Sequence, residues 1–143
     1  MSDAQLPDPA TPIGRRVRER LQREQIIWLT QVAPSGTPQP NPVWFCWNGS
    51  EVVIYNYAKA RRLTSLRDRP RVSLNFNADA TGDDVIVLTG RAVIDPELPA
   101  AHAWPDYVAK YGEAMARISG SLEAFGERYS VATRVSIDRV RGF

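Results

Sequence analysis

Three prolines at every second position, Pro38, Pro40 and Pro42, constrain this chain more than any other feature of its sequence. Successive residues of a β-strand direct their N–H groups to alternate edges, so prolines spaced by two remove three donors from one edge. A strand that lacks these donors cannot pair on that side and must lie at the edge of a sheet. Either this edge is simply protected against aggregation, or its unpaired backbone faces a flat ligand.

Hydrophobic periodicity predicts strands over most of the chain and helices in three regions. We expect strands at 26–32, 39–47, 51–57, 71–77, 83–94 and 129–140. We expect helices at 13–25, at 58–69 and, broken near Gly112 and Gly120, at 97–127. Gly36 and the Asn48-Gly49 pair mark tight turns, and strands joined by tight turns are antiparallel. Because there is no βαβ alternation, the prediction is a mainly β protein with flanking helices, a barrel or sandwich, of which we favour a six- to seven-stranded antiparallel barrel.

The length of 143 residues is that of one domain. Residues 1–12, acidic and rich in proline, are expected to form a disordered leader, and residues 13–143 a single domain. The hydrophobic content of 43% is typical of a globular protein. No apolar run approaches the roughly 20 residues of a membrane-spanning helix, and we recognise no signal peptide. We therefore expect a cytoplasmic protein with no membrane partner.

The side chains that most often perform catalysis or bind metals are scarce. Cys46 is the only cysteine and His102 the only histidine. The chain therefore cannot form an internal disulfide or a cysteine-based zinc site, no metal is expected, and no catalytic residue is identified. We expect Cys46 to be a buried small hydrophobic residue and Tyr107 and Tyr111, at helical spacing, to pack against the barrel.

Positive charge is concentrated in one segment. Between Tyr57 and Arg71 the sequence has six basic residues and one acidic residue, in a chain whose net charge is only +2. The basic residues are Lys59, Arg61, Arg62, Arg67, Arg69 and Arg71. The first three gather where a strand is expected to end and a helix to begin, a place suited to a phosphate. The alternatives are a solvated charged helix face and a nucleic-acid-binding barrel, and the low overall charge argues against the latter.

Together, these patterns resemble the split β-barrel flavin-binding superfamily that includes pyridoxamine 5′-phosphate oxidase, and more specifically its actinobacterial F420-dependent enzymes. The resembling segments are WLT (28–30), GTPQPNPVWF (36–45), KARRLTSL (59–66), RPRVSL (69–74) and the ending from 129 to 143. The resemblance implies a split β-barrel of the FMN-binding type that forms a homodimer with cofactor sites at the interface. It also implies that the proline-rich strand passes beside the cofactor ring and that the junction after residue 55 holds the phosphate.

The resemblance assigns cofactor binding to particular positions. These are Pro40, Pro42, Val43, Trp44, Asn56, Tyr57, Ala58, Lys59, Arg61, Arg62 and Leu63. One position departs from the family pattern: relatives have a phosphate-binding lysine eight residues before the proline of the Arg-Pro pair, where this chain has Arg62. Lys59 and Arg61 lie close enough in sequence to share the role.

The implied function is an oxidoreductase that uses coenzyme F420 to transfer a hydride to or from a small-molecule substrate. F420 carries an oligoglutamate tail and more negative charge than FMN, so an arginine-rich protein suits it. One hypothesis places the arginines of the first helix at the rim that receives this tail; they are Arg15, Arg16, Arg18, Arg20 and Arg23. The alternatives are an FMN-dependent oxidoreductase of the same fold and a non-catalytic protein that binds F420, flavin or haem.

Overall fold

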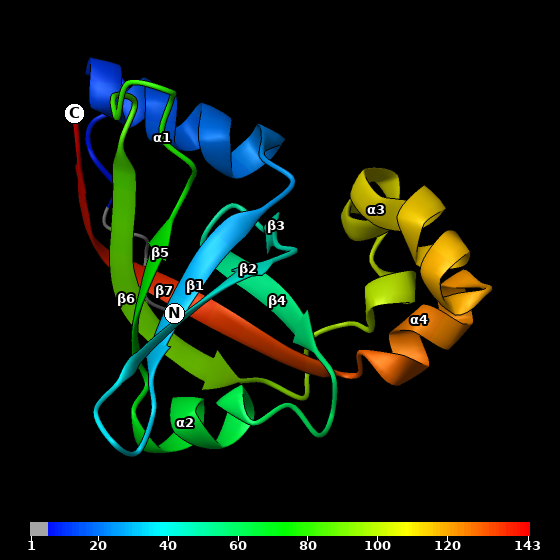
Figure 1. Ribbon diagram of the computed structural model, residues 1–143. Helices are drawn as coiled ribbons and strands as arrows, with labels where there is room; N and C mark the ends of the chain where they lie inside the picture. The colour runs from blue at the N-terminus through cyan, green and yellow to red at the C-terminus, as the bar shows by residue number, and fades with distance from the viewer. Residues whose placement is uncertain (1–5) are drawn as a thin grey trace.

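The strands of this protein form one antiparallel sheet that curls into a half-barrel, shown in Figure 1. The structure is a computed structural model that describes residues 6–143. The seven strands lie in the order β2-β1-β5-β6-β7-β4-β3, and every pairing is antiparallel. The mainly β split-barrel prediction is therefore confirmed.

The sheet is made of seven strands, and helices flank it. The strands are β1 (Ile27–Val32), β2 (Pro38–Val43), β3 (Cys46–Trp47), β4 (Glu51–Asn56), β5 (Arg71–Asn75), β6 (Ile86–Ile94) and β7 (Val131–Gly142). The helices are α1 (Pro12–Arg23), α2 (Arg62–Asp68), α3 (Pro105–Ser119), α4 (Leu122–Arg128) and a short 3₁₀ turn, η1 (Ala101–Ala103). Among residues 6–143, no helix has the length and apolar character of a membrane span.

Strand β2 lies at one end of the sheet, as its prolines predict. It pairs with β1, where Pro40 lies opposite Thr30 and Pro42 opposite Trp28. Because a proline has no N–H to donate, the N–H groups that reach β1 come from the residues between the prolines. The other edge of β2 pairs with no strand in the part of the chain that the structure describes.

The expected strand at 39–47 is wrong as a single element, because the chain leaves the sheet at Trp44 and Phe45 and re-enters it as β3. Strand β3 lies at the opposite end of the sheet from β2. Three peptide steps, from Val43 to Cys46, span at most roughly 11 Å. The two ends of the sheet must therefore approach each other, and this short crossing segment is what curls the sheet into a split barrel.

Two hydrophobic clusters lie on opposite faces of the curled sheet. The first fills the interior and includes Val17 and Leu21 of α1, which close one end of the half-barrel. The second lies outside, where Tyr107, Tyr111 and Phe125 of the α3–α4 pair pack on the outer face of β4 and β7. The expected packing of the two tyrosines is confirmed, and this outer cluster borders the cavity described below.

The described part of the leader, from Leu6, contacts the domain. Leu6 packs against the interior cluster, and the Pro7 carbonyl accepts a hydrogen bond from Arg18 at 2.7 Å. The Thr11 hydroxyl accepts a hydrogen bond from Gly14 N–H and caps α1. Residues 1–5 of the expected leader lie outside the described residues.

The expected helical regions differ from the structure in three places. The helix expected at 97–127 begins, as α3, only at Pro105, after the 3₁₀ turn η1. Gly112 lies within α3, whereas Gly120 ends that helix with φ +89°, the left-handed conformation that favours glycine. Helix α2 begins at Arg62, because residues 58–61 form turns after β4. The turns expected at Gly36 and Gly49 are confirmed, with φ +86° and +96°.

Candidate functional site

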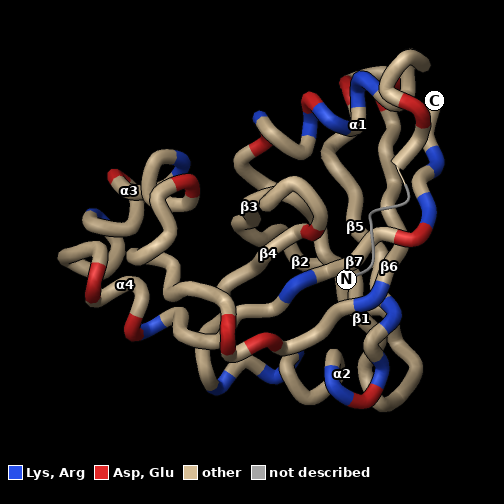
Figure 2. The backbone as a smooth tube through the Cα atoms, turned by 180° about the vertical axis from the view of Figure 1, so that it is seen from behind, with Lys and Arg blue, Asp and Glu red and all other residues tan. Residues whose placement is uncertain are grey.

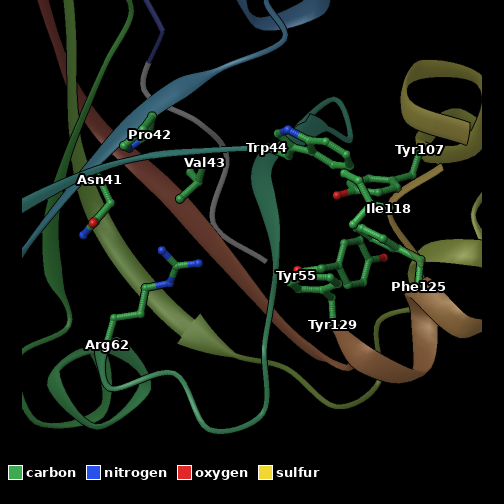
Figure 3. A pocket seen from close by; sticks show the side chains of 10 residues that line it. All are labelled: Asn41, Pro42, Val43, Trp44, Tyr55, Arg62, Tyr107, Ile118, Phe125 and Tyr129. Atoms are coloured by element: carbon green, nitrogen blue, oxygen red, sulfur yellow. The ribbon is translucent and has the colours of Figure 1, made fainter. Parts of the chain in front are cut away.

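A cavity of about 370 Å³ opens between strand β2, strand β4, the start of α2 and the α3–α4 pair, and Figure 3 shows the side chains around it. Its lining residues come from five parts of the chain: Asn41, Pro42, Val43, Trp44, Tyr55, Arg62, Tyr107, Ile118, Phe125 and Tyr129. Arg62 lies on one side of the cavity and the aromatic rings lie on the other (Figure 3).

The aromatic side of the cavity is a stack of rings drawn from the crossing segment and the helices. Trp44 lies parallel to Tyr111, with ring centroids 4.5 Å apart, and stacks on Phe125 at 5.6 Å. Phe125 in turn contacts Tyr129 at 4.6 Å. Such rings present flat, weakly polar faces, so this side of the cavity suits a planar aromatic ligand.

The opposite side of the cavity carries the guanidinium of Arg62. Its Nε donates a hydrogen bond of 2.8 Å to Oδ1 of Asn56, the last residue of β4. Asn56 is completely buried, and its own Nδ2 donates to the Val131 carbonyl of β7 at 2.9 Å. This chain of contacts fixes the direction of the guanidinium.

The two amino groups of Arg62 have no hydrogen-bond partner among residues 6–143, and Figure 3 shows the guanidinium turned toward the cavity. Desolvation by burial lowers the pKa of Arg62, which nevertheless stays protonated at physiological pH. A half-buried cation that pairs with no carboxylate of residues 6–143 offers a planar, two-pronged donor to an anion such as a phosphate.

The hydroxyl groups near the cavity differ in what they can do. Tyr55 donates to the Pro99 carbonyl at 2.6 Å, and burial raises its pKa to about 12. Burial also raises the pKa of Tyr107, whose hydroxyl makes no hydrogen bond to any residue in the described range. Tyr107 therefore offers the cavity a neutral hydroxyl that can donate to a ligand.

The residues assigned by resemblance are only partly brought together here. Pro42, Val43, Trp44 and Arg62 line the cavity, and Asn56 lies behind Arg62. The remaining assigned residues do not line it: Pro40, Tyr57, Ala58, Lys59 and Arg61 are exposed, and Leu63 is buried. Of the three cations assigned to phosphate binding, only Arg62 lines this cavity.

The sequence interpretation missed six lining residues: Asn41, Tyr55, Tyr107, Ile118, Phe125 and Tyr129. One sequence signal was available, since Phe125 and Tyr129 are four positions apart and so share a helix face. Nothing in the sequence places that face beside Trp44, because the two segments meet only through the packing of α3 and α4 on the sheet.

The arginines of α1 do not support the proposed rim for an acidic tail. Arg20 is buried and pairs with Asp84 at 2.8 Å and with Glu24 at 2.7 Å, and Arg16 also pairs with Asp84. Arg18 donates to two backbone carbonyls. Figures 1 and 2 show α1 and α2 at opposite ends of the half-barrel. Three of the five arginines thus tie α1 to its own chain, far from Arg62.

A curled antiparallel sheet, with a donor-poor edge strand and an aromatic cavity beside a single oriented arginine, defines a split β-barrel protein. Residues 13–142 match the sequence model of the pyridoxamine 5′-phosphate oxidase family, and the chain belongs to this family. No curated protein sequence matches the chain.

Solved structures share the fold at low sequence identity. An F420 reductase is 20% identical, with a TM-score of 0.67 over 87% of this chain and 94% of its own. HutZ, a haem storage protein from Vibrio cholerae, is 17% identical, with a TM-score of 0.65 over 90% and 92%. An FAD-binding protein from Mesorhizobium loti is 15% identical, with a TM-score of 0.58 over 88% of each chain.

Proposed function

We propose that this protein binds a flavin-type cofactor, coenzyme F420 or, as the alternative, FMN, in the cavity beside Arg62 and acts as an oxidoreductase on a small molecule. One observation carries the proposal: Arg62 is held by Asn56 through Nε, while its two amino groups face the cavity with no partner among the described residues. A phosphate would neutralise this charge and occupy both amino groups.

The residues of the cavity fit the parts of such a cofactor. Arg62 would hold the phosphate, and the stacked rings that include Trp44 would lie against the flat ring system. The Tyr107 hydroxyl would donate to a polar edge of the ligand. When bound, a reduced deazaflavin supplies a hydride, so the protein's part is to bind, orient and exclude water. This division of labour agrees with a cavity whose lining, within the described part of the chain, includes no histidine, cysteine or carboxylate.

The proposed function also involves a second copy of the chain. The cavity is open on one side, and it borders β2, whose outer edge pairs with no strand in the described structure. A second protomer that covers this side would enclose the cofactor, as the family resemblance implies. We therefore propose a homodimer with two cofactor sites at its interface.

Haem is the second candidate ligand, because a haem storage protein shares the fold. Histidine, cysteine and methionine are common haem ligands, and none of them is among the residues of 6–143 that line the cavity; these offer only tyrosines for this purpose. The composition of the cavity therefore favours a cofactor that is held by stacking and by its phosphate over one held through a metal.

The test is a fluorescence titration of the purified protein with F420, FMN and haem. The proposal expects F420 or FMN to bind more tightly than haem, and tight binding of haem alone would overturn it. The variant Arg62→Gln keeps a hydrogen-bonding side chain but removes the charge, so F420 affinity should fall at least tenfold, since a charge-assisted hydrogen bond contributes roughly 1.5–3 kcal/mol. Arg67→Gln, an exposed position on the same helix, is the matched control and should bind normally.

A further inference from the structure

The crossing segment between β2 and β3 is held by two consecutive residues of α3. Tyr111 Oη accepts a hydrogen bond of 3.0 Å from the Phe45 N–H and lies 2.6 Å from the Gln25 carbonyl, to which it donates. Lys110 Nζ donates to the Phe45 carbonyl at 2.8 Å. Both backbone polar groups of Phe45 are therefore satisfied by side chains of a helix instead of by a neighbouring strand.

The same two residues also contact the side chains of the crossing segment. The Lys110 ammonium lies 3.7 Å from the centroid of the Phe45 ring, within the range of a cation–π interaction. The Tyr111 ring lies parallel to the Trp44 ring. Trp44 lines the cavity, whereas Lys110 and Tyr111 do not. Lys110 and Tyr111 can therefore influence the cavity only indirectly, through their contacts with Phe45 and Trp44.

We propose that Lys110 and Tyr111 are positioning residues: they clamp the Phe45 backbone and so fix the orientation of Trp44 in the cavity wall. An alternative, purely structural role would be to fill space between α3 and the sheet. The clamp differs from that role because it depends on a charge and on a hydroxyl, which can each be removed with little change in volume.

The charge on Lys110 depends on pH near the physiological range. A second cavity, of about 400 Å³, lies between α1, β3 and α3, and Lys110 lines it. No carboxylate forms an ion pair with Lys110 among residues 6–143. The charged or titratable groups that face Lys110 from the packed elements are Glu24 after α1, Cys46 of β3, and Asp106 and Tyr111 of α3. Desolvation lowers the pKa of Lys110 to about 8, so the ammonium loses its proton just above neutral pH.

Loss of this proton weakens the clamp. A neutral amine still donates to the Phe45 carbonyl, but the charge-assisted part of that hydrogen bond and the cation–π contact disappear. Trp44 should then become less firmly held as the pH rises through about 8. The thiol of Cys46 does not interfere, because burial raises its pKa from 9.0.

The first experiment needs no ligand. Protein labelled with 5-fluorotryptophan has four ¹⁹F resonances, one for each tryptophan, and Trp44→Phe assigns the relevant one. The resonance of Trp44 should shift with a midpoint near pH 8 in the wild type, and this titration should vanish in Lys110→Met. Lys59→Met removes the other lysine, which is exposed, and should leave the titration unchanged. A Trp44 resonance that titrates equally in Lys110→Met, or that keeps its wild-type chemical shift at pH 7 in both Lys110→Met and Tyr111→Phe, overturns the proposal.

The second experiment measures the effect on binding and rests on the proposed function. Lys110→Met and Tyr111→Phe should each bind F420 about 3- to 10-fold more weakly, and Lys110→Arg, which keeps the charge, should recover most of the affinity. If the wild type binds no flavin-type cofactor, the proposed function fails while the fluorine titration still decides the clamp. If the wild type binds but Lys110→Met binds equally well at pH 7, the clamp is overturned and the function stands.

Discussion

Asn56 and Arg62 are joined by a hydrogen bond of 2.8 Å that links the end of strand β4 to the first residue of helix α2. The bond converts a flexible arginine into a donor of fixed direction. Because Asn56 also donates to β7, it anchors Arg62 to the sheet, and Arg62 is the one charged residue among those of residues 6–143 that line the cavity. A buried amide that does not itself line the cavity therefore fixes the direction of the charge that does.

Replacing Asn56 with alanine should therefore weaken both the fold and the site. The Val131 carbonyl would lose its donor inside the protein, at a cost on the order of 1–3 kcal/mol in unfolding free energy. Arg62 would lose its partner, so F420 affinity should fall by a factor similar to that for Arg62→Gln. Urea denaturation and fluorescence titration measure the two effects. Unchanged F420 affinity in Asn56→Ala would contradict the orienting role.

Arg20 and Arg23 provide a matched pair on helix α1. Arg20 is buried and forms ion pairs with Asp84 and Glu24, whereas the Arg23 side chain is 67% exposed. Arg20→Met should lower the unfolding free energy by on the order of 2 kcal/mol, because it leaves Asp84 and the Asn77 carbonyl without a buried donor. Arg23→Met should change it by less than about 0.5 kcal/mol. Equal losses in chemical denaturation would show that the ion pairs of Arg20 are not structural.

The contribution of Lys110 to stability should depend on pH with a defined sign. Its pKa falls from 10.5 to about 8 on folding, so between these values the unfolded chain binds the proton more tightly than the folded chain does. The unfolding free energy due to Lys110 should accordingly rise as the pH increases from about 8 toward 10.5, and should be constant below this window. The difference between the wild type and Lys110→Met, measured by urea denaturation at pH 7, 8 and 9, isolates this effect. A difference that stays flat or falls with pH would contradict the lowered pKa.

Gly90 lies where β6 and β7 shift register, and there is no room for a side chain. A Cβ on this residue would fall 1.9 Å from the Ser136 carbonyl oxygen, a backbone atom that cannot move alone. Gly90→Ala should reduce the unfolding free energy by on the order of 1–3 kcal/mol. Gly82→Asn, in an exposed turn with φ +82° and open space around it, is the control and should cost much less. A thermal melt of Gly90→Ala that matches the wild type would show that the strands can separate at this point.

Local sequence patterns were sufficient where one segment decides its own structure. The proline alternation at 38–42 predicted an edge strand because a missing N–H prevents pairing wherever that strand lies. Gly36 and Gly49 predicted turns because few other residues adopt a positive φ readily. The break at Trp44 and Phe45 escaped prediction because its cause, the grip of Lys110 and Tyr111, lies 65 residues away in the chain.

Periodicity, proline chemistry and charge are properties of neighbouring residues, and they were enough to predict a mainly β barrel with one unpaired edge and a cluster of cations after the strand that ends at Asn56. Which of these cations lines the cavity depends on contacts between segments that are distant in the chain. Of Lys59, Arg61 and Arg62, only Arg62 donates to the buried amide of Asn56 and lines the cavity. The aromatic wall was likewise decided by packing, because the curl of the sheet and the docking of α3 and α4 bring together rings that are far apart in the chain.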